Sequence, residues 1–367
     1  MTIGPDAEAL PPWLAAPLAQ ALAQQRAHAL LVHAAPGIGS LPFALALAQG
    51  WLCEADAPAP GRAALPTLSA VSAMSTAPRP CGRCASCRLL QSRSHPDLLV
   101  LMPEALRVSL GWTAGETEEG AEGGKPRKKP SRQIRIDEVR GAIDWIVRTA
   151  SRGRAKVVVM HPADALNPQA ANALLKTLEE PPGGARLVLT CAQPANLLPT
   201  VRSRCQRLPL PMPTRGEALA WLAGQGVQGA EVMLAAAGGR PLEALDLVAA
   251  GVDAAAWSAL PAAVARGRAQ ALSGWPVARA VDALHKLCHD AMVQAAGGAP
   301  RFFASLPGGA RLPALVEWSQ RLSRTARHDE HPWNETLLIE ALVAQGSRAW
   351  MAGATPHAAS GFDTLPV

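Results

Sequence analysis

Four short apolar runs recur along the first 190 residues, and a helical pattern separates each run from the next. They are rich in branched side chains and occupy residues 29–33, 98–101, 156–160 and 186–190. Runs of this length and composition are typical of buried β-strands. Because strands that alternate with helices are joined by crossover connections, they form a mostly parallel sheet covered by helices. The first part of the chain is therefore predicted to be an α/β domain.

A glycine turn follows the first apolar run and leads into a helical pattern, as at the start of a nucleotide-binding α/β unit. A phosphate loop needs glycines to wrap the phosphates, a Lys for the terminal phosphates and a Ser or Thr hydroxyl for magnesium. Gly37 and Gly39 are present, but Ala34 stands in place of the first glycine. Ser40 stands where the Lys belongs and Leu41 where the hydroxyl belongs. The loop is predicted to be degenerate.

The third apolar run lacks the acidic pair that ATP hydrolysis requires at this point. One carboxylate of such a pair holds magnesium and the other polarises the attacking water. His161 and Pro162 follow the run instead, and neither can do this. We therefore expect that the chain does not hydrolyse ATP, and no ATP is expected as a cofactor.

Four of the seven cysteines fall within a span of 35 residues. Cys81, Cys84 and Cys87 are separated by two residues each, so a turn can direct all three sulfurs to one point, and Cys53 can complete a tetrahedron. This spacing favours a structural Zn²⁺ site with four protein ligands and no open position for water. An iron–sulfur cluster would accept the same four thiolates, but nothing else in the sequence indicates redox chemistry.

His95 could replace Cys53 as the fourth ligand. It lies in a His-Pro-Asp sequence at residues 95–97, which introduces the second apolar run. We expect this sequence to order the turn through side-chain hydrogen bonds instead of binding metal.

After about residue 213 the strand patterns end, and the rest of the chain is predicted to be helical. Residues 54–80 and 111–132 interrupt the first domain as long inserts, and both are expected to be mobile. The tail, residues 351–367, has no periodic apolar face and is expected to be disordered.

Composition limits the classes of protein that this chain can belong to. Charged residues make up 17% of the chain, but no uncharged stretch forms a clean membrane span. The start of the chain lacks the pattern of a secretory signal, so we expect a cytoplasmic protein. A net charge of +6 suits work near nucleic acid without requiring it.

Several segments together are similar to a known family. They are residues 28–33, 95–97, 136–139, 172–182 and 203–205, of which 172–182 reads Asn-Ala-Leu-Leu-Lys-Thr-Leu-Glu-Glu-Pro-Pro. Together with the four clustered cysteines, these segments resemble the bacterial clamp-loader subunits of DNA polymerase III, which belong to the AAA+ class. The resemblance extends over about residues 12–212. Some subunits of this family lack an intact phosphate loop and acidic pair but retain the zinc module and a Ser-Arg-Cys motif, and this sequence looks like them.

The resemblance implies a domain organisation. The expected parts are a degenerate nucleotide-binding domain at 1–212 with a zinc module at 53–95, a helical lid at 213–260 and a helical collar at 261–350. Such a chain assembles with delta-type and gamma/tau-type subunits into a hetero-pentameric ring. The ring brings it to the sliding clamp and primer-template DNA, without contact to a membrane.

The resemblance also implies a role for the motif Ser203-Arg204-Cys205. In the family this arginine reaches into the ATP site of the adjacent subunit, where its guanidinium can neutralise charge that develops on the γ-phosphate. Without the motif, Arg204 would be interpreted as an ordinary solvated arginine. In the lid, Leu242 aligns with a second ATP-contacting arginine of active relatives, although Arg240 lies close by.

Two alternatives remain at this point. One is an active AAA+ clamp-loader ATPase subunit, against which the four substituted positions argue. The other is a zinc-containing DNA-binding protein in which Arg148, Arg152, Arg154 and Lys156 contact phosphates, although the same residues could form a solvated helix end.

Overall fold

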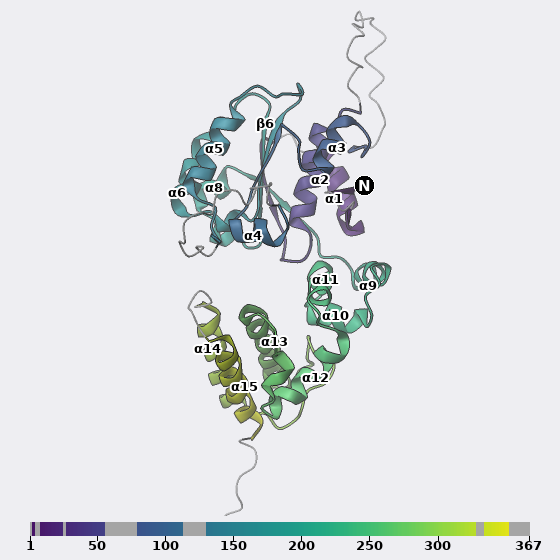
Figure 1. Cartoon of the computed structure of the whole chain (residues 1–367), viewed down its shortest axis with the longest axis vertical. Helices are drawn as coiled ribbons and strands as arrows, with labels where there is room; N and C mark the ends of the chain where they lie inside the picture. Colours follow the sequence, from purple (N-terminus) through teal and green to yellow (C-terminus); the bar gives the residue numbers. More distant parts are fainter. Residues whose placement is uncertain are drawn as a thin grey trace, which may run out of the picture. The chain divides into compact units, whose positions relative to one another are not determined.

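The computed structural model describes residues 2–3, 8–24, 27–55, 79–112, 130–327 and 334–351. The chain divides into two compact units, Met1–Glu217 and Ala218–Val367 (Figure 1). The predicted inserts at 54–80 and 111–132 and the tail at 351–367 lie almost entirely outside the described residues.

The first unit is built on a parallel sheet of five strands in the order β4-β5-β6-β3-β7. The strands are β3 Ala29–His33, β4 Leu98–Leu101, β5 Lys156–Met160, β6 Ala185–Cys191 and β7 Gln206–Pro209. This arrangement confirms the predicted α/β class with a parallel sheet. β3, β4, β5 and β6 match the apolar runs closely, whereas β7 was not predicted because it is mostly exposed and begins with two polar residues.

Helices cover both faces of the sheet (Figure 1). One face carries α1 Ala15–Gln24 and α2 Ser40–Leu52, and the other carries α5 Ile136–Ile146, α6 Pro168–Ala173 and α8 Pro199–Ser203. The sheet is buried between these layers, which is why β3 and β5 are continuous apolar runs and not alternating ones.

The predicted helix after β5 is present, with a break. Asn167 caps α6 by accepting a hydrogen bond from the Ala170 N–H at 2.7 Å, and Pro168 occupies the first turn. At Leu174 the helix changes to α7 Leu175–Glu179, which ends before the two prolines. The remaining elements of this unit are β1 Thr2–Ile3, β2 Glu8–Ala9, η1 Pro12–Leu14, α3 Ala85–Gln91, α4 Glu104–Ser109, η3 Ala163–Ala165 and η4 Pro194–Asn196.

The described part of the second unit contains helices and no strands. They are α9 Arg215–Gly224, which begins just before the unit boundary, α10 Ala230–Ala236, α11 Pro241–Ala249, α12 Ala254–Ala265, η5 Ala269–Leu272, α13 Val277–Ala295, α14 Leu312–Arg327 and α15 Glu335–Met351. One buried apolar cluster runs through these helices and includes the fully buried Trp257 and Trp318.

No single described helix is long and apolar enough to cross a membrane. Only α11 and α12 taken together reach the required length and hydropathy, and they are bent by 84°.

Candidate functional site

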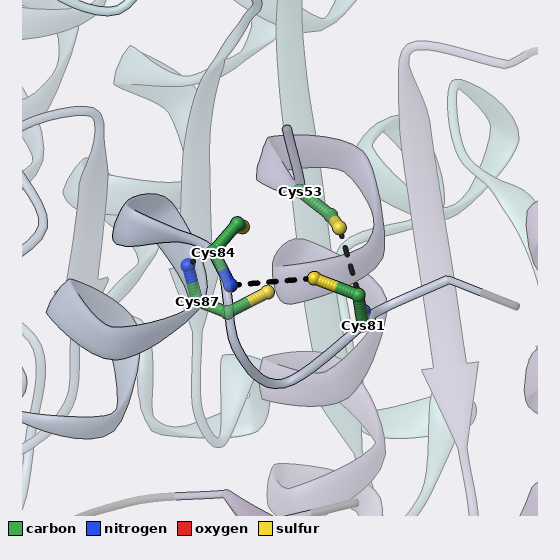
Figure 2. A group of neighbouring side chains, drawn as sticks. All are labelled: Cys53, Cys81, Cys84 and Cys87. Atoms are coloured by element: carbon green, nitrogen blue, oxygen red, sulfur yellow. Dashed lines mark hydrogen bonds between the residues drawn. The ribbon is translucent and has the colours of Figure 1, made fainter. Parts of the chain in front are cut away.

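The four predicted cysteines meet in one cluster between the end of α2 and the start of α3 (Figure 2). Cys53 follows the last residue of α2, and Cys84 is the N-cap of α3. All four Sγ atoms lie within 4.8 Å of one another. A tetrahedral zinc with Zn–S bonds of about 2.3 Å separates its sulfurs by about 3.8 Å, so a small contraction would bring the cluster to that geometry.

Backbone N–H groups point at these sulfurs. The N–H groups of Cys81, Cys84 and Cys87 donate to the sulfurs of Cys53, Cys81 and Cys84, and each donor–acceptor distance is 3.4 Å. The Glu54 N–H also donates to the Cys84 sulfur at 3.4 Å. Such donors favour the thiolate, which is the form of cysteine that binds metal.

The thiols of the cluster differ in acidity. Burial raises the pKa of Cys53 and of Cys87. Burial also opposes ionisation of Cys81, but N–H donors from Arg83 and Cys84 outweigh it and bring its pKa to about 6. Buried thiolates packed this closely repel one another, and a bound dication would offset that repulsion. The donor set and its spacing therefore fit Zn²⁺.

His95 is not part of the sulfur cluster. Its Nε2 lies 2.6 Å from Ser86 Oγ, and its Nδ1 accepts the Asp97 N–H at 3.0 Å. Asp97 is fully buried and accepts the N–H groups of Ser151 and Arg152 at 2.7 and 2.9 Å. The His-Pro-Asp sequence thus orders its turn through hydrogen bonds.

The glycine turn predicted to be a degenerate phosphate loop lies between β3 and α2. Gly37 and Gly39 have φ angles of 78° and 111°, in the left-handed region that favours glycine. The Ile38 N–H donates to Ala35 O at 3.3 Å, and Ile38 O accepts from the indole N–H of buried Trp13 at 2.9 Å. Ser40 begins α2, and half-buried Leu41 follows it.

The end of β5 carries a neutral histidine in place of an acidic pair. His161 Nδ1 lies 2.6 Å from Thr190 Oγ1 on the neighbouring strand β6, and Pro162 follows. Burial lowers the pKa of His161 to about 4, so its imidazole is uncharged at neutral pH. Neither His161 nor Pro162 offers a carboxylate for a magnesium ion.

Arg204 is the C-cap of α8, and its guanidinium is docked on its own chain. Its Nε donates to Glu179 Oε1 at 2.6 Å, and its Nη2 contacts the same oxygen. Its Nη1 donates to Thr200 O at 3.0 Å and to Ser203 Oγ at 3.3 Å. The side chain remains 33% exposed, so it can be reached from outside the unit. Cys205, in contrast, is buried, and burial raises its pKa to about 11.

The structure disagrees with the basic cluster considered for DNA binding. Lys156 is buried, pairs with Asp97 at 3.4 Å and lies 3.9 Å from the centre of the Trp145 ring. Arg152 pairs with Glu54 at 2.6 Å. Only Arg148 and Arg154 remain of the four residues, and they are separated by a turn. The four do not form one phosphate-binding face.

In the second unit, Arg240 is engaged within its own helix end. Its Nη2 lies 2.7 Å from Glu243 Oε2, and its Nε donates to Ala237 O at 2.8 Å. Leu242 is half-buried in the first turn of α11.

Two residues that contact the predicted site residues were not predicted. Glu179 lies within the Glu-Glu-Pro-Pro segment, and Thr190 ends an apolar run. Their partners are 25 and 29 residues away in sequence, and local spacing gives no signal for such contacts.

Residues 14–214 match the family described as "DNA polymerase III, delta subunit". A "DNA polymerase III subunit delta'" from Pseudomonas aeruginosa is 37% identical over 232 residues, which cover 62% of this chain and 58% of the relative. The Escherichia coli protein of the same description is 30% identical over 297 residues, covering 75% of this chain and 76% of the relative. A solved gamma subunit-related protein of DNA polymerase III from Thermotoga maritima aligns at 16% identity, with a TM-score of 0.44, over 90% of this chain and 98% of its own. The chain thus spans between just over half and three-quarters of these two curated relatives.

Proposed function

Because this chain belongs to the delta-prime family of DNA polymerase III subunits, we propose that it is the clamp-loader subunit that does not hydrolyse ATP and instead supplies an arginine to a neighbour. The family predicted from the sequence is confirmed. In the proposed assembly the chain is a stator in a hetero-pentameric ring with delta-type and gamma/tau-type subunits. The ring loads the sliding clamp onto primed DNA during replication, in the cytoplasm.

Arg204 carries the proposal. It lies in the Ser203-Arg204-Cys205 motif at the end of α8, where buried Cys205 fixes the backbone and the guanidinium stays accessible. A guanidinium is permanently charged and can hold a phosphate group with two hydrogen bonds. If this guanidinium reaches the γ-phosphate of ATP bound to a neighbouring subunit, it would stabilise the charge that develops there during hydrolysis.

The absence of hydrolysis by this chain follows from four positions. Ser40 and Leu41 supply neither the Lys nor the magnesium-binding hydroxyl, and His161-Pro162 supplies no carboxylate. Since these groups stabilise and activate the phosphate chemistry, their loss supports a chain without ATPase activity of its own.

Cys53, Cys81, Cys84 and Cys87 would hold one zinc ion. Bound there, zinc supplies a structural cross-link and no chemistry, because four protein ligands close its coordination shell. The cross-link would tie the end of α2 to the start of α3.

We also propose a helical lid at 213–260 and a helical collar at 261–350. The described helices of the second unit agree with the helical character of both parts, and because they share one buried cluster the two parts would pack together as one unit. We propose that the collar helices hold the chain in the ring.

Reconstitution tests the proposal. The full chain is mixed with delta-type and gamma/tau-type subunits of the same organism, and DNA-dependent ATP hydrolysis is measured with wild type, Arg204→Ala and the control Arg207→Ala. Arg207 is exposed on β7, so its loss should leave the rate unchanged. At the site that receives Arg204 the rate should fall about a thousandfold or more, while the other sites continue to turn over.

Two results would contradict the proposal. Equal rates for both variants would remove Arg204 as the supplied arginine. Tight, magnesium-dependent ATP binding by the isolated chain in a calorimeter would instead favour an active ATPase subunit.

A further inference from the structure

A cavity opens at the opposite end of the sheet from the glycine turn. It has a volume of about 400 Å³, and its lining includes Arg79, Arg154 and Arg186 with Trp51 and Gly50 of α2. Arg154 immediately precedes the start of β5, and Arg186 is the second residue of β6. These are amino-terminal strand ends, whereas Gly37 and Gly39 follow the carboxyl end of β3.

Arg186 is held rigidly at this cavity. Its guanidinium carbon lies 4.9 Å from the centre of the Trp51 ring, and its Nη1 donates to Ala27 O at 3.2 Å. Burial lowers its pKa, but an arginine remains protonated in proteins. A guanidinium fixed by an aromatic ring and one carbonyl still has N–H donors for another partner.

Among the described residues, no acidic side chain lines the cavity and no carboxylate pairs with Arg154 or Arg186. The nearby Glu54 is engaged by Arg152 at 2.6 Å and is not part of the lining. Arg154 and Arg186 are both half-buried at this one hollow, and an anion would offset the cost of partly desolvating their two charges.

We propose that this cavity binds phosphate oxyanions, with Arg154 and Arg186 as the principal donors and Arg79 at its edge. Arginine suits this ligand because its planar fork matches two phosphate oxygens. The phosphate could belong to a free polyphosphate or to the backbone of single-stranded DNA, since both present the same oxygens. The site goes beyond the proposed function, because neither Arg204 nor the glycine turn takes part in it.

The test uses the full chain and two probes. Pyrophosphate is titrated in a calorimeter, and a fluorescent single-stranded oligonucleotide is titrated by anisotropy at two salt concentrations. Arg154→Gln should weaken binding about tenfold or more, the loss expected for one charge-assisted contact. Arg148→Gln removes the same charge from an exposed position outside the cavity and should bind like wild type.

Arg154 is the variant of choice because it has no described side-chain partner, so its replacement should leave the fold intact; circular dichroism checks this. Arg186→Gln is a second test variant, provided that its circular dichroism spectrum matches that of wild type, and it should weaken binding in the same way. If Arg154→Gln weakens the binding of both probes and Arg148→Gln weakens neither, the cavity is a general phosphate site. If Arg154→Gln weakens the binding of one probe only, that probe identifies the source of the phosphate. In the DNA case the salt slope should fall by about 0.7. Absence of binding by wild type, or equal behaviour of Arg154→Gln and Arg148→Gln, overturns the proposal.

Discussion

Arg204 and Glu179 form an ion pair in which the arginine Nε lies 2.6 Å from the Glu179 Oε1. Glu179 is the last residue of α7 and Arg204 is the C-cap of α8, so the ion pair joins the ends of two short helices. Both side chains are partly exposed, at 49% for Glu179 and 33% for Arg204. To reach a phosphate of a neighbouring subunit, Arg204 must exchange this carboxylate for the phosphate oxygens.

Glu179→Gln should therefore separate stability from catalysis. The exposed pair contributes at most about 1 kcal/mol, so the free energy of unfolding in urea should fall by no more than that. The exchange of partners becomes easier without the carboxylate, so DNA-dependent ATP hydrolysis by the assembled complex should not fall. A rate as low as that of Arg204→Ala would show that Glu179 positions the guanidinium and does not compete for it.

His161 should make the folded chain sensitive to mild acid. Its pKa is lowered to about 4 by burial, below the usual value of about 6.5 in the unfolded chain. The unfolded state therefore binds the proton first, and the stability that is complete above pH 6.5 is lost as the pH falls toward 4. His161 alone should contribute a loss of roughly 2 kcal/mol between pH 7 and pH 5.

His161→Gln is the variant that isolates this effect. The amide can still meet Thr190 Oγ1, but it does not titrate. Urea unfolding at pH 7 and pH 5 should show a smaller difference for the variant than for wild type. The same difference in both proteins would mean that other groups account for the acid sensitivity.

The sheet was predictable where burial leaves a continuous mark on the sequence. β3, β4 and β5 match the predicted runs residue for residue, because helices cover both faces of the sheet and the strand interiors are therefore apolar. β7 was missed because it exposes Gln206 and Arg207, so its pattern resembles a loop, whereas the other edge strand, β4, is a run of four apolar residues.

In the candidate site, too, some features were predictable from local sequence and others were not. The cysteine cluster depends on short spacing around one turn plus one helix end, so it could be predicted from local sequence. The Arg204–Glu179 and His161–Thr190 contacts depend on how α7 meets α8 and how β5 pairs with β6. No periodicity or motif carries that information.

Gly346 should resist a side chain because α15 lies very close to α14 at this point. A Cβ atom there would come within 2.5 Å of the Trp318 ring, which is fully buried. Gly346→Ala should therefore lower the free energy of unfolding by about 1–3 kcal/mol, measured in urea. Gly141→Ala in α5 is the matched control, since nothing lies within 4 Å of its Cβ position. That change should stabilise the chain by about 0.5–1 kcal/mol, and a stabilising effect at both glycines would contradict the close packing.

Cys84→Ser should remove zinc while leaving α3 capped. In the structure the Cys84 sulfur accepts the Cys87 N–H at the start of α3, and a serine hydroxyl can accept the same bond. A hydroxyl is a poor substitute for a thiolate as a zinc ligand, so metal analysis of the purified variant should show the loss of stoichiometric zinc.

Cys205→Ala is the control, because Cys205 is buried away from the cluster and its replacement should leave the zinc content unchanged. Full zinc occupancy in Cys84→Ser would exclude Cys84 as a required ligand, whereas loss from Cys205→Ala alone would place the metal elsewhere in the chain.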